Sequence, residues 1–216
     1  GTRSGWRVEA LLTDMNRPLG RSVGNSLEVH EVVRTLRGEG PADLVELTFA
    51  LGARMLAMIG TPGDDDALRT LLADALYSGR AFERFLKMVH LQGGDPVFVE
   101  SPRELPAAST IELLPAPNAG YVTAVDAEKV GRAAFILGAG RTRREDTVDF
   151  AVGLSDLKQV GEPVAKGESL GRIHANATEH LEEARTLLAS SFIIDNDHSE
   201  PTDLIKERIK DLNVAH

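Results

Sequence analysis

The sequence predicts an α+β chain with two domains, a mostly helical one followed by one built of short strands. Two observations carry this prediction. Between residues 27 and 89 apolar side chains recur every three or four positions, the spacing of helices that bury one face. After Gly93 a proline-rich stretch precedes short apolar runs separated by glycines, which is typical of strands joined by tight turns. A chain of 216 residues that is 42% hydrophobic can bury a core in such a fold.

In the first half, each helix is expected where the helical period holds and ends where glycine or proline interrupts it. Met55 and Met58 lie on one apolar stripe and are read as core residues. The expected elements are a buried strand at 8–15, a helix from 27 to the GEGP at 38–41, a helix from Pro41 to Gly60, a helix with cap candidates at 64–66 and apolar positions at 68–76, and a helix with apolar positions at 82–89.

In the second half, glycines punctuate the apolar runs, so short strands and tight turns are expected. The expected elements are a strand at 109–116, a partner strand at 121–125 across the turn 117–120, a helix from the cap Asp126 to Gly138, a small curled sheet at 148–175 with turns at Gly153, Gly161, Gly167 and Gly171, a helix at 178–191 with Thr178 as cap candidate, a strand at 192–195, and a tail with room for one terminal helix.

Charge and composition exclude several function classes. The net charge of −9 argues against a nucleic-acid or anionic-membrane partner, because affinity for phosphate backbones comes mainly from clustered lysine and arginine. The chain has no cysteine, which excludes disulfides, cysteine zinc sites and a thiol nucleophile. It also has no apolar run long enough to span a membrane and no signal-peptide pattern at its start. We therefore expect a cytoplasmic protein with small-molecule or protein partners.

Two long runs resemble the pyrimidine-nucleoside and thymidine phosphorylases. The first is LLTDMNRPLGRSVGNSLEVHEVVRTLRGEGPADLVEL, residues 11–47. The second is LGAGRTRREDTVDFAVGLSDLKQVGEPVAKGESLGRIHA, residues 137–175, which is similar to the C-terminal domain of the family. The resemblance implies an α/β (α+β) fold from the C-terminal half of these enzymes. Residues 1–105 would be the mostly helical C-terminal portion of the central α/β phosphorylase domain, residues 106–197 an α/β-hammerhead domain of barrel-sandwich form, and residues 198–216 a polar tail.

The activity implied by this resemblance is that of a pentosyltransferase. Phosphate displaces the pyrimidine from C1′ of uridine, thymidine or deoxyuridine, which gives the free base and ribose or deoxyribose 1-phosphate. The family holds phosphate with a glycine-rich loop that contains Lys, His and Ser, and holds the base with an Arg, a Ser and a Lys. Neither motif occurs in this sequence. We therefore assign no catalytic residue here and expect these residues alone to be inactive.

One functional element of the family falls on this chain. The resemblance implies a potassium ion held by the backbone carbonyls of Leu19 and Ser22 and by the carboxylate of Glu31. Potassium is a large cation that carbonyl oxygens satisfy well, and Gly20 and Gly24 would allow the loop to turn. The family's remaining ligands come from its phosphate loop, so the site would be weak or incomplete in these residues.

The resemblance also implies partners. They are a pyrimidine nucleoside, phosphate as co-substrate, the N-terminal part of the same enzyme, and a second copy in a homodimer. The family dimer forms mainly through an N-terminal helical domain, so we do not expect these residues to make it. The sequence leaves open whether thymidine, uridine or AMP is the preferred substrate. A non-catalytic scaffold that kept the same half of the family is the alternative function.

Several residues keep simpler readings. Without the resemblance, Glu31 would be read as a solvated helix residue. Asp14 and Asn16 could orient substrate or form an Asx turn. Gly138 reads as a helix C-cap in preference to a phosphate loop, because it follows a helix. The hairpin VGEPVAKGESLG also resembles biotinyl and lipoyl carrier domains, in which case Lys166 would carry the modification.

Overall fold

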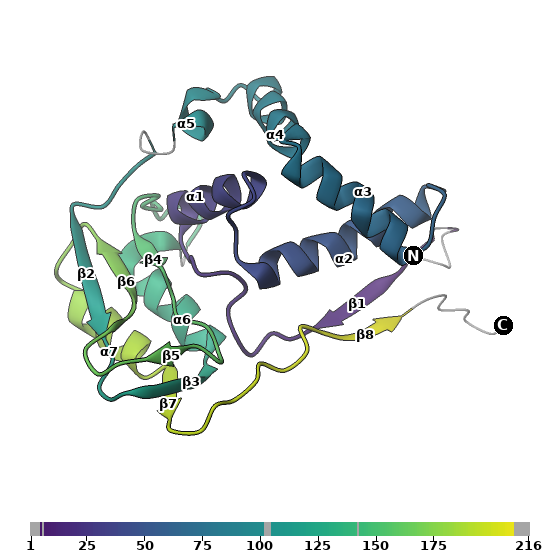
Figure 1. The fold of residues 1–216 in the computed structure, drawn as a ribbon. Helices are drawn as coiled ribbons and strands as arrows, with labels where there is room; N and C mark the ends of the chain where they lie inside the picture. The colour runs from purple at the N-terminus through teal and green to yellow at the C-terminus, as the bar shows by residue number, and fades with distance from the viewer. Residues whose placement is uncertain (1–4, 6, 102–104, 142, 210–216) are drawn as a thin grey trace.

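The computed structural model describes residues 5, 7–101, 105–141 and 143–209. The described residues form a helical part and a second part of small sheets and helices, and a C-terminal segment runs back from the second part to the first (Figure 1). The predicted α+β class is confirmed. Among the described residues, no helix is both long and apolar enough to cross a membrane.

The helical part contains the four long helices expected from the periodicity and a strand within 8–15. The predicted burial of that strand is wrong, because its residues alternate between exposed and half-buried. Asp64 caps the third of these helices by accepting a hydrogen bond from the backbone N–H of Ala67 at 2.9 Å. A further short helix lies in the proline-rich stretch, where none was predicted. The elements are β1 (Ala10–Thr13), α1 (Asn25–Leu36), α2 (Ala42–Met58), α3 (Asp65–Tyr77), α4 (Arg80–Leu91) and α5 (Val97–Glu100).

The predicted terminal helix is wrong for residues 205–209, which form strand β8 (Ile205–Ile209). This strand pairs antiparallel with β1, with Ala10 opposite Ile209 and Thr13 opposite Ile205. The pairing supplies hydrogen-bond partners to backbone N–H and C=O groups of both strands, and this favours a strand over a helix in this polar segment. Residues 210–216 lie outside the described residues. The C-terminal segment therefore returns to the helical part and pairs with β1 (Figure 1).

The second part consists of two three-stranded sheets and two helices. The sheets have the strand orders β2-β6-β4 and β5-β3-β7. The elements are β2 (Thr110–Pro115), β3 (Gly120–Val125), α6 (Ala127–Ala134), a π-helical turn η3 (Phe135–Ala139), β4 (Gly153–Ser155), β5 (Pro163–Val164), β6 (Ser169–Ala175), α7 (Leu181–Ala189) and β7 (Phe192–Asp195).

The predicted pairing of strands 109–116 and 121–125 is wrong. β2 pairs with β6, whereas β3 pairs with β5 and β7. The turn between β2 and β3 therefore passes the chain from one sheet to the other. Gly120 permits the change because β7 lies against it: a Cβ at this position would be 2.4 Å from the backbone oxygen of Asp195.

The local signals of this part were right in some places and wrong in others. Gly161 and Gly167 have positive φ angles, as expected for turn glycines, but Gly153 begins β4 and Gly171 lies inside β6, so the turns predicted at these two positions are wrong. Asp126 caps α6 through the N–H of Lys129, and Gly138, with a φ of 103°, interrupts the helical backbone inside the following turn η3. Thr178 does not cap α7, which starts after His180 without a side-chain cap.

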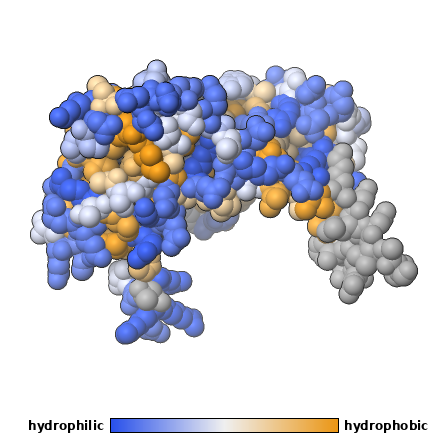
Figure 2. Space-filling view, turned by 90° about the horizontal axis from the view of Figure 1, so that it is seen from below, coloured by the Kyte–Doolittle hydropathy of each residue, from blue (hydrophilic) through white to orange (hydrophobic). Residues whose placement is uncertain are grey.

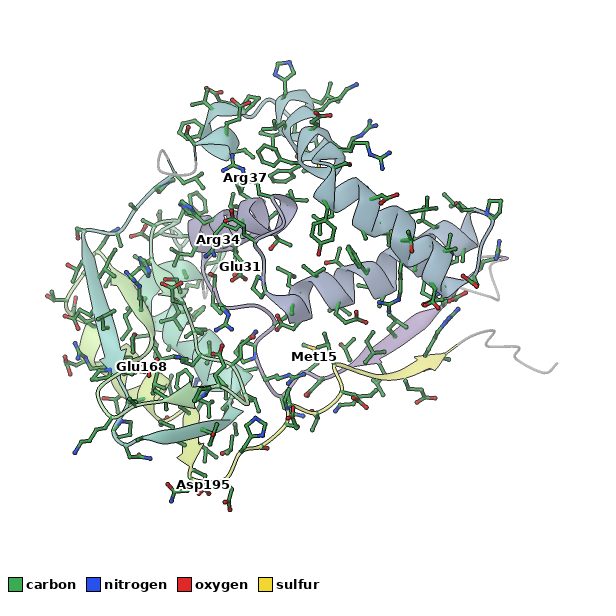
Figure 3. All side chains as sticks on the ribbon, viewed as in Figure 1. Met15, Glu31, Arg34, Arg37, Glu168 and Asp195 are labelled. Atoms are coloured by element: carbon green, nitrogen blue, oxygen red, sulfur yellow. The ribbon has the colours of Figure 1, made fainter. Side chains whose placement is uncertain are left out.

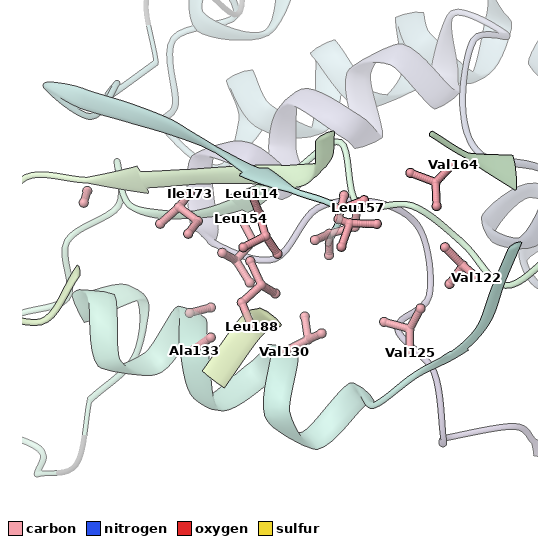
Figure 4. Close-up of a cluster of buried hydrophobic side chains, with 14 of the residues drawn as sticks. Leu114, Val122, Val125, Val130, Ala133, Leu154, Leu157, Val164, Ile173 and Leu188 are labelled. Atoms are coloured by element: carbon pink, nitrogen blue, oxygen red, sulfur yellow. The ribbon is translucent and has the colours of Figure 1, made fainter. Parts of the chain in front are cut away.

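The main core lies in the second part, between the sheets and the two helices (Figure 4). Leu154, Leu188 and Ile173 are fully buried there. Fully burying such side chains contributes about 1.5 to 3 kcal/mol each. The buried cluster comprises Leu114, Ala116, Val122, Val125, Val130, Ala133, Ala134, Leu154, Leu157, Val164, Leu170, Ile173, Ala175, Leu181 and Leu188.

The helical part leaves much of its apolar surface uncovered. Met55, predicted to be a core residue, is 67% exposed, and Ile59 is 80% exposed. With Leu51 they recur every four residues, so they lie along one side of α2 that faces no described element closely enough to be covered. Figure 2 shows apolar patches between charged regions on the face seen from below.

Candidate functional site

The candidate site is built on the loop 14–24, which connects β1 to α1. Its second half is held by the second part of the molecule. Val23 and Leu154 exchange backbone hydrogen bonds of 2.8 and 2.9 Å, and the N–H of Leu157 donates to the carbonyl of Arg21 at 3.1 Å. The loop therefore lies where both parts of the molecule meet.

Helix α1 brings Glu31 back to this loop. Its Oε1 accepts hydrogen bonds from the backbone N–H of Arg21 at 2.9 Å and from the Oγ of Ser22 at 3.2 Å. Glu31 and Arg34 project from the same side of α1 into the space beside the second part (Figure 3). Two of the three sequence-predicted cation ligands, Ser22 and Glu31, are thus in contact.

Gly20 is required next to Glu31. Its φ is 71°, and a Cβ on it would lie 2.3 Å from Glu31 Oε2. The carboxylate therefore fills the space that a larger residue would occupy. The backbone N–H of Gly20 donates to the Oδ2 of Asp43, at the start of α2, over 3.0 Å.

The environment of Glu31 disfavours an isolated negative charge. Burial raises the pKa of Glu31 above its ordinary value, the hydrogen bonds from Arg21 and Ser22 oppose this shift, and the nearby carboxylate of Asp43 adds to it. A bound cation would remove this penalty, because an opposite charge at close range favours the ionised carboxylate.

The loop that contacts Glu31 also offers backbone carbonyls. Within the described ranges, no group donates a hydrogen bond to the carbonyl of Leu19 or of Ser22. Across the same ranges, no three His, Cys, Asp or Glu side chains cluster in a way that could hold a metal ion. Free carbonyls with one carboxylate are a donor set for a large monovalent cation rather than for zinc. The residues present therefore fit the ion that the resemblance implies.

Asp14 and Asn16 form the Asx turn that was one of their two readings. The Oδ1 of Asp14 accepts from the N–H of Asn16 at 3.0 Å and from its Nδ2 at 2.9 Å. The Oδ2 accepts from the Oγ1 of Thr202 at 2.7 Å. Asp14 thus ties the start of the loop to the segment that leads into β8.

A cavity of about 570 Å³ adjoins Glu31, between α1 and the sheet β2-β6-β4. Ser155 Oγ and His174 Nε2 form a 2.8 Å hydrogen bond in its wall. Burial lowers the pKa of His174, which favours the neutral ring. No local pattern in the sequence points to this pair, because the two residues belong to different strands, β4 and β6.

Lys166 is exposed in the turn between β5 and β6. Within this turn, Ala165 and Glu168 are joined by hydrogen bonds, and Gly167 has a φ of 82°. Exposure alone does not distinguish a carrier lysine from an ordinary surface lysine, so the carrier reading gains nothing from the geometry.

Comparisons with known proteins cover most of the chain. Residues 121–195 match the family described as pyrimidine nucleoside phosphorylase C-terminal domain. A pyrimidine-nucleoside phosphorylase of Staphylococcus epidermidis strain RP62A is 38% identical over 202 residues, which are 94% of this chain and 46% of the relative. The pyrimidine-nucleoside phosphorylase of Staphylococcus aureus strain USA300 is 39% identical over 196 residues, 91% of this chain and 45% of the relative. The chain thus spans about half the length of these relatives.

Proposed function

Because this chain resembles the pyrimidine-nucleoside phosphorylases over nearly its whole length, and resembles their C-terminal domain at 121–195, we propose that it supplies the C-terminal part of such an enzyme. The complete enzyme would cleave uridine, thymidine or deoxyuridine with phosphate. The observation that carries the proposal is the 38% identity over 94% of the chain. The hydrogen bond between Ser22 and Glu31 supports the proposal, because it brings together two of the residues to which the resemblance assigns a function.

The proposed reaction makes and breaks one bond at C1′ of the sugar. A phosphate oxygen forms a bond to C1′ while the bond from C1′ to the base nitrogen breaks. The electron pair of that bond leaves with the base, which then takes up a proton. Both the phosphate and the leaving base are anions, so the enzyme must offer cations and hydrogen-bond donors to each. The glycine-rich phosphate loop and the base-binding Arg, Ser and Lys are not found in these 216 residues.

In this proposal Leu19, Ser22 and Glu31 hold a potassium ion. When bound, the ion supplies positive charge close to the phosphate-binding region of the complete enzyme. The chain's own residues prepare the place for it. Glu31 provides the charge partner, and Asp43 and Glu31 fix the peptide between Leu19 and Ser22 by accepting from the N–H groups of Gly20 and Arg21. With these ligands alone the ion would bind weakly.

The same proposal extends to the architecture and the partners. Residues 106–197 would form an α/β-hammerhead domain of barrel-sandwich form. The exposed apolar side of α2, with Leu51, Met55 and Ile59, favours coverage by another polypeptide surface. We assign that coverage to the N-terminal part of the enzyme, and the homodimer to the complete enzyme only.

The test is phosphate-dependent release of uracil or thymine. The 216-residue chain alone should release none from uridine, deoxyuridine or thymidine, whereas the complete enzyme should release base and form the sugar 1-phosphate. Isolation of the chain from its native source, followed by intact-mass measurement, separates the scaffold alternative. A solitary chain without an N-terminal partner would favour the scaffold, and an added mass on Lys166 would favour a carrier.

A further inference from the structure

Besides the backbone bonds between Val23 and Leu154, the second part of the molecule contacts the candidate cation site through the turn at residues 157–162, between β4 and β5. Two residues of this turn bind Arg21. The Nη2 of Arg21 donates to Glu162 Oε1 at 2.6 Å, and its Nη1 donates to Glu162 Oε2 and to the carbonyl of Leu157, each at 3.0 Å. This is a two-point contact between guanidinium and carboxylate, which fixes direction as well as distance.

Arg21 is also the residue whose backbone positions Glu31. Its N–H donates to Glu31 Oε1 at 2.9 Å, and its carbonyl accepts from the N–H of Leu157 at 3.1 Å. Arg21 is therefore held by three different groups: its side chain bonds to Glu162 and Leu157, its carbonyl to the N–H of Leu157, and its N–H to Glu31. A displacement of the turn 157–162 moves Arg21, and with it the hydrogen-bond donor that orients the Glu31 carboxylate.

Gln159 adds a second connection from the same turn. Its Nε2 donates to Asp43 Oδ2 at 2.9 Å, the same oxygen that accepts from the N–H of Gly20 at 3.0 Å. Its own N–H donates to Glu162 Oε2 at 2.8 Å, which holds the Glu162 carboxylate toward Arg21. Asp43 and Glu31 thus accept hydrogen bonds from the backbone between Leu19 and Ser22, and Gln159 in turn holds the Asp43 carboxylate.

The ion pair is present at neutral pH. Burial alone would raise the pKa of Glu162, but the hydrogen bonds from Arg21 and from the N–H of Gln159 lower it below the ordinary value. The side chains of Arg21 and Glu162 are 33% and 30% exposed, so the pair is partly shielded from water and salt.

We propose that Arg21 and Glu162 are positioning residues of the candidate cation site, and that through them the second part of the molecule sets the affinity for a monovalent cation. This inference rests on the proposed function, because it takes the ligands Leu19, Ser22 and Glu31 from it. A site built from carbonyls loses affinity when its oxygens are displaced, since the surroundings must hold them in place.

The experiment titrates KCl against choline chloride at constant ionic strength and follows the thermal unfolding midpoint of the complete enzyme. The K⁺ concentration at which the rise begins reports affinity without any use of activity, because the stabilisation grows with the logarithm of one plus the ratio of K⁺ concentration to dissociation constant. Glu162→Gln keeps the shape of the side chain but removes its charge. It should raise that concentration at least about fivefold, the lower end of typical coupling between two sites. Arg21→Lys, which keeps the charge but not the two-point contact, should raise it in the same direction and serves if Glu162→Gln does not fold.

The matched control is Glu112→Gln. Glu112 forms an ion pair with Arg185 in the same part of the molecule but outside the turn 157–162, and the two side chains are 31% and 32% exposed, close to the values of Glu162 and Arg21. This variant should leave the K⁺ concentration at which the rise begins unchanged. Equal values for wild type, Glu162→Gln and Glu112→Gln, with a clear K⁺ response in all three, would overturn the positioning role and leave the cation site standing. Absence of any K⁺ response in wild type would overturn the cation site itself, and this inference with it.

Discussion

The carboxylate of Glu31 occupies the space beside Gly20 in which a side chain would otherwise lie. A Cβ on Gly20 would be 2.3 Å from Glu31 Oε2, although the two residues belong to a loop and to a helix. The contact defines the candidate site more sharply than either residue alone, because it fixes where the negative charge lies relative to the carbonyls on both sides of Gly20.

Replacement of Gly20 by alanine should displace Glu31 and lower stability. The left-handed backbone at φ 71° costs a residue with a Cβ about 1–2 kcal/mol. The displaced carboxylate also loses its bonds to Arg21 and Ser22, for about 1 kcal/mol more. Gly60→Ala is the control, because Gly60 has a φ of 86° and no atom within 4 Å of an added Cβ. Urea unfolding should show a larger loss for Gly20→Ala, and equal losses would contradict the contact.

Glu31→Gln should abolish the stabilisation of the complete enzyme by potassium. In the absence of the ion, the raised pKa of Glu31 means that its proton stabilises the fold at low pH, and this contribution is lost as pH rises through the folded pKa. The potassium effect has the opposite sign, because the ion needs the ionised carboxylate. Thermal unfolding in KCl and choline chloride at several pH values should therefore show a K⁺ increment that grows with pH in wild type. An undiminished increment in Glu31→Gln would remove Glu31 from the ligand set.

Asp14→Asn should weaken the connection between the loop and the C-terminal segment. The hydrogen bond from the N–H of Asn16, together with that from Thr202, lowers the pKa of Asp14. The stabilisation is therefore present above the unfolded pKa and is lost as pH falls through the folded pKa. We expect Asp14→Asn to lose about 1–3 kcal/mol at neutral pH. Thr202→Val, which removes one of the bonds, should lose less, and the same loss in both variants would argue against a shared role of the Asp14 carboxylate.

His174 should contribute to the decline of stability in mild acid. Burial lowers its pKa most, Asp156 opposes the shift, and Arg172 and His30 add to it. Its neutral form favours the fold above the unfolded pKa, and this contribution is lost as pH falls. Denaturant unfolding between neutral pH and mild acid should show a shallower decline for His174→Gln than for wild type. His90 is exposed on α4, so His90→Gln should follow wild type, and a parallel decline in His174→Gln would contradict the assignment.

The helices could be predicted because their apolar period is local. A glycine follows the end of each of the four long helices of the first part, as Gly60 does after α2 and Gly93 after α4, whereas α7 ends at Ala189 without one. The buried stripe on α2 was placed wrongly at Met55, because a period shows which residues share a face but not whether anything covers that face.

The strand pairing could not be predicted from the same signals. Two strands around a short turn favour a hairpin, yet β2 and β3 enter different sheets because β6 and β7 compete for them. The partner of β1 is equally distant in sequence, since Ala10 pairs with Ile209. Non-local pairing of this kind leaves little trace in a single segment.

In the candidate site too, some residues could be predicted from the sequence and others could not. Family resemblance pointed to Leu19, Ser22 and Glu31, and the structure adds the contact between Ser22 and Glu31 at 3.2 Å. Arg21 and Glu162 carried no signal, because ion pairs between residues 141 positions apart follow from the fold alone. The assignment of the ion stays a prediction.

The most direct measurement is phosphorolysis of uridine and thymidine by the 216-residue chain and by the complete enzyme, with and without phosphate. Our account predicts no base release by the chain alone. It predicts base release by the complete enzyme only in the presence of phosphate, with sugar 1-phosphate as the other product. Turnover by the chain alone, or release of free sugar by the complete enzyme without phosphate, would contradict it.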